Sequence, residues 1–272
     1  MRRSVLSALF VALALPAFAA EEAVKFGKDG KASGFIVTPE GKGPFPAVLV
    51  IQEWWGLDDW VKGQARALAK EGYVALAPDL YRGKVTNKQE EAHQYMMGLP
   101  SEQAMSDLKA SVDYLVARKD VQVNALGSVG WCMGGKYSLA LATEDPRLVA
   151  VVAYYGAPPQ DEAAIGKIKA KVLGNYGAED KGPAPEQVKT FLAAMEKAGK
   201  SADIKIYEGA GHAFANVNNP WGGYREAAAK DAWARTVAFF DENLKAPKAA
   251  PKPEPIIKKQ DETMPEAKKP KS

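Results

Sequence analysis

Short apolar runs that alternate with helical patterns constrain the fold of this chain more than any other feature. Residues 47–51 read Ala-Val-Leu-Val-Ile, a continuous apolar run typical of a strand buried on both faces. Further strands are expected at residues 73–77, 129–131, 148–155, 171–176 and 202–207. Strands that alternate with helices predict right-handed βαβ crossovers. We therefore predict an α/β fold with a mostly parallel central sheet flanked by helices on both faces.

Helical spacing fills the segments between these strands. Asp58 or Asp59 can cap a helix that ends at Gly72, and Ser101 can cap another. Three more helices are expected at residues 134–143, 188–199 and 233–244. In a sheet of this kind, binding and catalytic sites form at the carboxyl ends of the strands.

The two ends of the chain differ from its centre. Arg2 and Arg3 precede an apolar stretch and the sequence Ala17-Phe18-Ala19, so residues 1–19 read as a signal peptide. The apolar stretch is too short to span a membrane, and no later segment is long and apolar enough. We expect a secreted, periplasmic protein.

The rest of the chain is predicted to hold one domain, residues 20–245, and a disordered basic tail, residues 246–272. The tail is rich in Lys, Pro and Ala and cannot bury enough apolar surface to offset its ordering entropy. It is either a weak tether to an anionic envelope surface or simply solvated, and we favour the second. The whole chain has 36 Lys and Arg against 33 Asp and Glu, which argues against nucleic acid as a partner. We expect a monomer.

Cys132 is the only cysteine of the chain, so it cannot form a disulfide within it. The residues around it, Gly130-Trp131-Cys132-Met133-Gly134-Gly135, follow an apolar strand. This G-x-C-x-G-G pattern matches a nucleophile elbow with a thiol in place of the usual serine, and small neighbours let the backbone pass close to the strained turn. A buried, inert cysteine is the alternative. The glycines favour a nucleophile.

A base and an acid follow Cys132 in the order that such a nucleophile needs. Of the two histidines, His93 lies in a polar helical segment, whereas His212 lies in a glycine-rich loop after the last expected strand. Asp180 also follows a strand, with Glu179 as its competitor. Nucleophile, acid and base in this order are typical of α/β-hydrolases. Two separated histidines give no metal-ligand cluster, so we expect neither a metal nor a cofactor.

The chain resembles the dienelactone hydrolase family (carboxymethylenebutenolidases), which has the α/β-hydrolase fold. The resemblance covers residues 23–244 and rests on motifs at 52–56, 78–82, 130–135, 155–156, 177–180 and 211–214. It implies a triad of Cys132, Asp180 and His212. It also implies that Glu53 contacts the cysteine and helps to deprotonate it when substrate binds. The backbone N–H groups of Trp54 and Met133 would form the oxyanion hole.

The resemblance also suggests substrate-binding residues: Arg82, Tyr155, Phe214 and Asn216. Members of the family that take dienelactone hold its carboxylate with two arginines, and Arg82 matches the first. Asn216 stands where the second is expected, and a neutral amide cannot replace a bidentate guanidinium. This argues against dienelactone as the natural substrate.

The predicted function is hydrolysis of a small ester or lactone through a thioester acyl-enzyme. Two other classes of protein remain open. A thiol-redox or peroxide-sensing protein would use Cys132 as its reactive thiol, although the chain lacks a resolving cysteine. A non-catalytic envelope-binding protein could retain the fold, although an intact triad argues against it.

Overall fold

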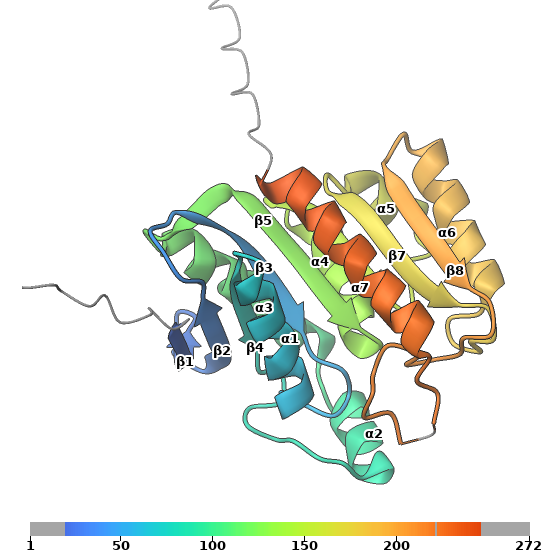
Figure 1. Ribbon diagram of the computed structural model, residues 1–272, viewed down its shortest axis with the longest axis horizontal. Coiled ribbons are helices and arrows are strands. Elements are labelled where there is room, and N and C mark those ends of the chain that lie inside the picture. The colour runs from blue at the N-terminus through green and yellow to red at the C-terminus, as the bar shows by residue number, and fades with distance from the viewer. Residues whose placement is uncertain (1–19, 221, 246–272) are drawn as a thin grey trace, which may run out of the picture.

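The computed structural model describes residues 20–220 and 222–245, which form an eight-stranded sheet with helices on both faces (Figure 1). The strands are β1 Ala20–Phe26, β2 Ala32–Thr38, β3 Phe45–Ile51, β4 Val74–Pro78, β5 Val121–Trp131, β6 Leu148–Tyr154, β7 Lys171–Gly177 and β8 Ala202–Tyr207. The helices are α1 Asp59–Lys70, α2 Gln89–Met97, α3 Ser101–Ala117, α4 Met133–Glu144, α5 Glu162–Lys167, α6 Pro185–Lys197 and α7 Glu226–Phe240. A π-helical turn, η1 Asp241–Lys245, continues α7. The predicted signal peptide and tail lie outside the described residues.

The strand order is β1-β2-β4-β3-β5-β6-β7-β8. Strands β3 to β8 pair in parallel, while β1 and β2 form an antiparallel hairpin that pairs antiparallel with β4. The prediction of a mostly parallel α/β sheet is therefore confirmed. Helices connect the parallel strands, as the alternating pattern predicted.

The apolar run of β3 explains why the sheet is covered on both faces. Ala47, Leu49 and Ile51 belong to one core, which contains the buried sides of α3, α4, α5 and α6. Val48 and Val50 belong to the other core, with α1 and α7. Successive side chains of a strand point to opposite faces, so a strand between two helical layers must be apolar at every position. Figure 1 shows α1 and α7 together in front of the sheet.

Of the two predicted helix caps, the one at the start of α1 is observed and the one at the start of α3 is not. The Asp58 carboxylate accepts a hydrogen bond of 2.9 Å from the Val61 backbone N–H and caps α1. Ser101 is the first residue of α3 rather than its cap. Pro100 occupies the capping position instead, with extended backbone and no side-chain hydrogen bond.

Three elements are not predicted by the sequence: β1, β2 and α5. The first five residues of β1 are exposed or half-buried, so the strand shows no apolar run. Helix α2 buries only Ala92, and its exposed His93 agrees with the polar helical segment expected there. A strand such as β1 that buries little leaves little hydrophobic pattern to read.

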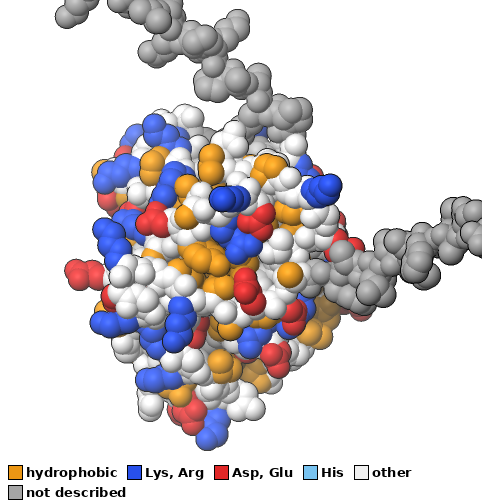
Figure 2. Space-filling view, turned by 90° about the vertical axis from the view of Figure 1, so that its left-hand side faces the viewer, with side chains coloured by type: hydrophobic (Ala, Val, Ile, Leu, Met, Phe, Trp, Pro, Cys, Tyr) orange, Lys and Arg blue, Asp and Glu red, His pale blue; other side chains and the backbone are white. Residues whose placement is uncertain are grey.

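The surface near the β1–β2 edge of the sheet carries both signs of charge. Figure 2 shows lysine and arginine side chains interspersed with aspartate and glutamate around small apolar areas on this face. Within residues 20–220 and 222–245, the longest apolar helical segments fall short of what a bilayer crossing requires.

Candidate active site

The candidate site lies along the carboxyl edge of the sheet, where β3, β5 and β6 end side by side. Strand register pairs Ile51 with Gly130 and Trp131 with Tyr154. Glu53, Cys132 and Tyr155 therefore follow directly at neighbouring strand ends. Asp180 and His212 follow β7 and β8 on the same edge. The topology brings together residues that are up to 159 positions apart in the sequence only because the strands are parallel.

Cys132 occupies a sharp turn between β5 and α4. Its backbone has φ 52° and ψ −116°, a conformation that a residue with a side chain seldom adopts. Its N–H donates a hydrogen bond of 3.0 Å to the Tyr154 carbonyl, and its carbonyl accepts one of 3.1 Å from the Lys136 N–H. The turn places the sulfur at the N-terminus of α4, where the helix dipole favours negative charge.

The glycines around Cys132 are required by close backbone contacts. A Cβ atom at Gly130 would lie 2.1 Å from the Gly134 carbonyl oxygen, and one at Gly134 would lie 2.2 Å from the Ile51 carbonyl oxygen. Gly135 and Gly156 pack against each other in the same way, with a Cβ at Gly156 only 2.3 Å from the Gly135 carbonyl carbon. The start of α4 thus lies directly on the backbone of the neighbouring strand ends.

Asp180, His212 and Cys132 form one interacting group. The Nδ1 atom of His212 lies 2.9 Å from an oxygen of Asp180, whose side chain is buried. The imidazole also interacts with the Cys132 side chain, which contributes to the raised pKa of His212. Since Nδ1 is occupied by Asp180, Nε2 is the ring atom left to face the sulfur. Glu179, the competing acid, is exposed.

The environment of His212 favours the imidazolium form. Burial alone would lower its pKa, but the hydrogen bonds and charges of Asp180 and Cys132 outweigh burial and raise the pKa to about 10. The ring is a third exposed. Its protonated form places a positive charge beside the sulfur of Cys132.

Glu53 is a buried carboxyl group in the same cluster. Only 2% of the residue is exposed, and burial raises its pKa to about 7. Two neutral groups oppose this shift: the Asn216 amide, 2.7 Å from one carboxyl oxygen, and the Tyr155 hydroxyl, 3.1 Å from the other. Glu53 therefore changes charge near neutral pH.

Three of the four residues expected to bind substrate lie in or beside this cluster, and their observed contacts are with the protein. Tyr155 and Asn216 donate hydrogen bonds to Glu53, as described above. Phe214 is fully buried and packs on Tyr155, with ring centroids 5.5 Å apart. Of the three, only Asn216 lines the adjoining cavity.

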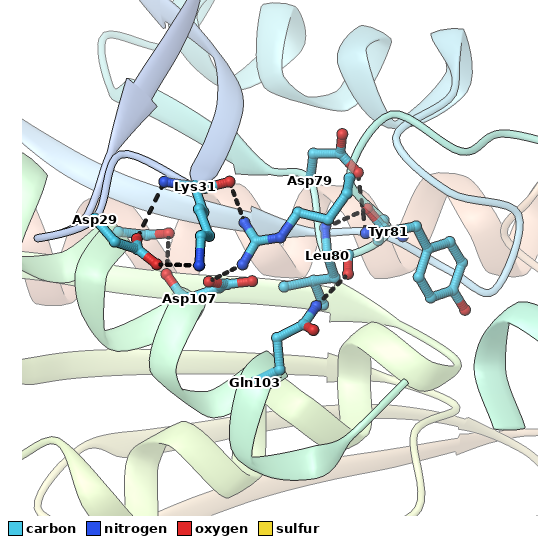
Figure 3. A network of polar contacts seen from close by, with 10 residues as sticks. Asp29, Lys31, Asp79, Leu80, Tyr81, Gln103 and Asp107 are labelled. Atoms are coloured by element: carbon cyan, nitrogen blue, oxygen red, sulfur yellow. Dashed lines mark hydrogen bonds and ion pairs between the residues drawn. The ribbon is translucent and has the colours of Figure 1, made fainter. Parts of the chain in front are cut away.

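Arg82 does not join the cluster. Its guanidinium donates to the Lys31 carbonyl and to Asp107 of α3, the latter at 2.8 Å. Figure 3 shows Lys31, Asp107 and the turn from Asp79 to Tyr81 in this network. Asp79 binds two backbone N–H groups of the turn, which fixes its shape. This geometry gives no support to Arg82 as a substrate-binding residue.

A cavity of about 290 Å³ opens beside the sulfur of Cys132. Its lining consists of Glu53, Trp54, Trp55, Met96, Cys132, Gly182, His212, Ala213, Asn216 and Asn219. None of these residues is a lysine or an arginine. Sequence reasoning missed Met96, although Tyr95-Met96-Met97 is an apolar end on an otherwise polar helix. The predicted oxyanion donors belong to this region too, and Met133 is the first residue of α4, where N–H groups lack intrahelical partners.

No group of three His, Cys, Asp or Glu side chains in the described part of the chain is arranged to hold a metal ion. The arrangement instead offers a thiol, an imidazole, a carboxyl group and backbone N–H groups around one cavity. These are the parts that acyl transfer through a covalent intermediate needs.

Comparison with known proteins identifies the family of the chain. A sequence model of the dienelactone hydrolase family matches residues 32–244. A protein of Methylorubrum extorquens, provisionally named carboxymethylenebutenolidase, is 36% identical over 227 residues, covering 78% of this chain and 77% of its own. Protein usf of Aquifex pyrophilus is 34% identical over 229 residues, covering 81% and 98%.

Solved structures give the same result. A protein of Klebsiella pneumoniae, provisionally titled a dienelactone hydrolase, superposes with a TM-score of 0.75 at 29% identity, covering 83% of this chain and 100% of that one. A dienelactone hydrolase-like promiscuous phosphotriesterase from metagenomic libraries gives 0.77 at 25% identity, covering 83% and 99%. The chain is a hydrolase that belongs to the dienelactone hydrolase family of the α/β-hydrolase superfamily.

Proposed function

We propose that the protein hydrolyses small, uncharged esters or lactones through a thioester formed on Cys132. The observation that carries this proposal is the hydrogen bond from Asp180 to His212, together with the position of His212 and Cys132 in the lining of one cavity. The strained backbone of Cys132 supports it further, because such strain persists where the surrounding structure enforces it.

In the first half of the reaction, the thiol proton leaves Cys132 and the sulfur attacks the carbonyl carbon of the ester. The tetrahedral intermediate carries a negative oxygen, which the backbone N–H groups of Trp54 and Met133 would stabilise. Its collapse breaks the bond to the leaving oxygen, and His212 gives that oxygen a proton. Asp180 keeps the imidazole oriented and stabilises its positive charge.

In the second half, water attacks the thioester. His212 takes a proton from the water as its oxygen bonds to the acyl carbon. The carbon–sulfur bond then breaks, the carboxylic acid leaves, and the sulfur of Cys132 recovers its proton from Glu53. Glu53 would assist the first half by accepting the proton of the thiol.

The cavity lining indicates uncharged substrates. It contains no lysine or arginine, and Glu53 would repel a carboxylate once ionised. Asn216 offers an amide that is already bound to Glu53. A substrate with a free carboxylate, such as dienelactone, would therefore meet no compensating charge. Trp54, Trp55 and Met96 supply apolar surface for an acyl or alcohol group.

The test is hydrolysis of a panel of neutral aryl esters, neutral lactones and dienelactone, with kcat/KM determined for each. We expect neutral esters to exceed dienelactone by about tenfold or more, the effect of one missing charge contact. A neutral phosphotriester belongs in the panel because one structural neighbour is named a promiscuous phosphotriesterase. Mass spectrometry of a quenched reaction should find the acyl group on Cys132.

The chain offers a matched pair of histidine variants as a control. His212→Ala should lose most of the activity, whereas His93→Ala, which changes the other histidine on the exposed side of α2, should retain it. Equal activity in both variants would contradict the proposed mechanism. If Cys132 reacts with peroxide or disulfides but no panel substrate is hydrolysed, the thiol-redox function is favoured instead. If Cys132 is inert and no substrate is hydrolysed, a non-catalytic envelope-binding protein is favoured.

We also propose that the protein is exported to the periplasm, on the basis of the N-terminal pattern alone. Cell fractionation, with sequencing of the mature N-terminus, would test this. Cleavage after Ala19 is the expected result.

A further inference from the structure

Both oxygens of the Glu53 carboxyl group are held by neutral donors from other parts of the sheet edge. The Tyr155 hydroxyl donates to Oε1 at 3.1 Å, and the Asn216 side-chain amide donates to Oε2 at 2.7 Å. The exposed fractions of the three residues are 2%, 0% and 2% for Glu53, Tyr155 and Asn216. Because all three are buried, the protein itself fixes the direction of the carboxyl group.

The backbone turns Asn216 toward Glu53. Its Oδ1 accepts a hydrogen bond of 2.8 Å from the Asn218 N–H, which leaves Nδ2 to point at the carboxyl oxygen. The Asn216 N–H itself donates to the Ala213 carbonyl at 3.1 Å. The amide of Asn216 is thus oriented before any substrate binds.

Tyr155 is held just as firmly. Its backbone has φ 38°, and its N–H donates to the Asn175 carbonyl at 2.9 Å. Its ring meets the edges of His212 and Phe214, with centroids 5.2 Å and 5.5 Å apart. Tyr155 therefore touches both the carboxyl group of Glu53 and the imidazole.

We propose that Tyr155 and Asn216 are positioning residues that hold the Glu53 carboxylate ionised and oriented to accept the proton of Cys132. Each carboxylate oxygen has two lone pairs, so the two bonds leave room for that proton. The proposal rests on the proposed function. It replaces the expected substrate-binding role of these two residues, and it means that Glu53 needs no cationic partner.

The charged and titratable groups around Glu53 set the direction of the expected effect. Burial raises its pKa, and repulsion from Asp58 adds to this, while the two donors and the positive charge of His212 lower it. Loss of either donor therefore moves the ionisation of Glu53 to higher pH. Glu53 would then be neutral over a wider range and could accept no proton there.

The experiment compares Tyr155→Phe and Asn216→Leu with the parent between pH 5 and pH 9, using a neutral aryl ester. A hydrogen bond to a charged group corresponds to roughly one unit of pKa. The midpoint of the acid limb of kcat/KM, near pH 7 in the parent, should rise by about one pH unit in each variant. Activity should fall about fivefold at pH 7 and return to the parent value at pH 9.

Two control variants separate positioning from packing. Asn124→Leu and Tyr224→Phe make the same chemical changes outside the cavity, and their pH profiles should match the parent. A role in packing alone would lower the melting temperature and reduce activity equally at every pH. That pattern, or unchanged midpoints in both Tyr155→Phe and Asn216→Leu, would overturn the proposal.

Alkylation keeps this test independent of the proposed function. Iodoacetamide can modify only Cys132 among the cysteines, since the chain has no other. Its rate should rise with pH through the same midpoint, and the midpoint should move in the same two variants. If the parent hydrolyses no ester but its alkylation midpoint moves as described, the proposed function is wrong and the positioning role stands.

Discussion

Replacing Glu53 with glutamine should stabilise the protein at neutral pH while slowing its reaction. The folded state binds the Glu53 proton more tightly than the unfolded state does, because burial raises the pKa from 4.5 to about 7. As the pH rises through this interval, the parent must ionise a buried group. The free energy of unfolding therefore falls with pH in the parent, and Glu53→Gln removes that fall.

The size of the effect follows from the pKa. At roughly 1.4 kcal/mol per pKa unit, a shift from 4.5 to about 7 corresponds to about 3 kcal/mol. Glu53 is 2% exposed, so solvent screens little of this penalty. At pH 4 the parent and the variant both carry a neutral side chain and should differ little. At pH 8 the variant should be more stable by about 3 kcal/mol.

Urea denaturation of both proteins at pH 4 and pH 8 measures this difference. Glu208→Gln is the matched control, because it makes the same change at an exposed position and should give no pH-dependent gain. Initial rates of ester hydrolysis on the same samples should show slower turnover for Glu53→Gln. Equal stability differences between parent and variant at pH 4 and pH 8 would refute the reasoning. Ionisation of Glu53 would then not lower the free energy of unfolding.

Four further variants test the site and its scaffold. Cys132→Ala should fold and show no ester hydrolysis above background; retained activity would exclude the thioester. Asp180→Asn should lower kcat by about 10²–10⁴-fold, because His212 loses its orienting acid and its raised pKa; a normal rate with unchanged pH dependence would assign the acid role elsewhere. Gly134→Ala should destabilise the fold by about 2–4 kcal/mol, since its Cβ would lie 2.2 Å from a carbonyl oxygen. Gly166→Ala, in open space on α5, should instead stabilise by up to about 1 kcal/mol, as urea denaturation of both glycine variants would show.

The central strands could be predicted because a strand that is buried on both faces is apolar at nearly every position. In β3 every residue after Phe45 is buried, so the apolar run is unbroken. In β1 only Phe26 is buried, and its antiparallel pairing with β2 depends on backbone hydrogen bonds that any sequence can make. The antiparallel edge of the sheet therefore left no signal of comparable strength.

The candidate site divides in a similar way. Cys132, Asp180 and His212 could be placed together because each follows a strand in the order typical of the superfamily. The contacts of Tyr155 and Asn216 could not be predicted, since they depend on backbone turns and on an approach between residues 163 positions apart. The departure of Arg82 depends likewise on Asp107 in a different element. Sequence motifs identified the residues, and tertiary geometry decided which partner each one meets.

Residues from the ends of five strands, from Glu53 to His212, make up the cluster around the sulfur. Such a set cannot exist on a partly assembled sheet, because β8 must pair with β7 before the imidazole can reach the thiol. The residues that make these contacts are far apart in the sequence, so we expect the contacts to form late as the chain folds. A nascent or truncated chain that ends before residue 212 would carry the thiol without its base. The onset of turnover is therefore a direct readout of complete folding, and refolding kinetics followed by ester hydrolysis would time the last step of assembly.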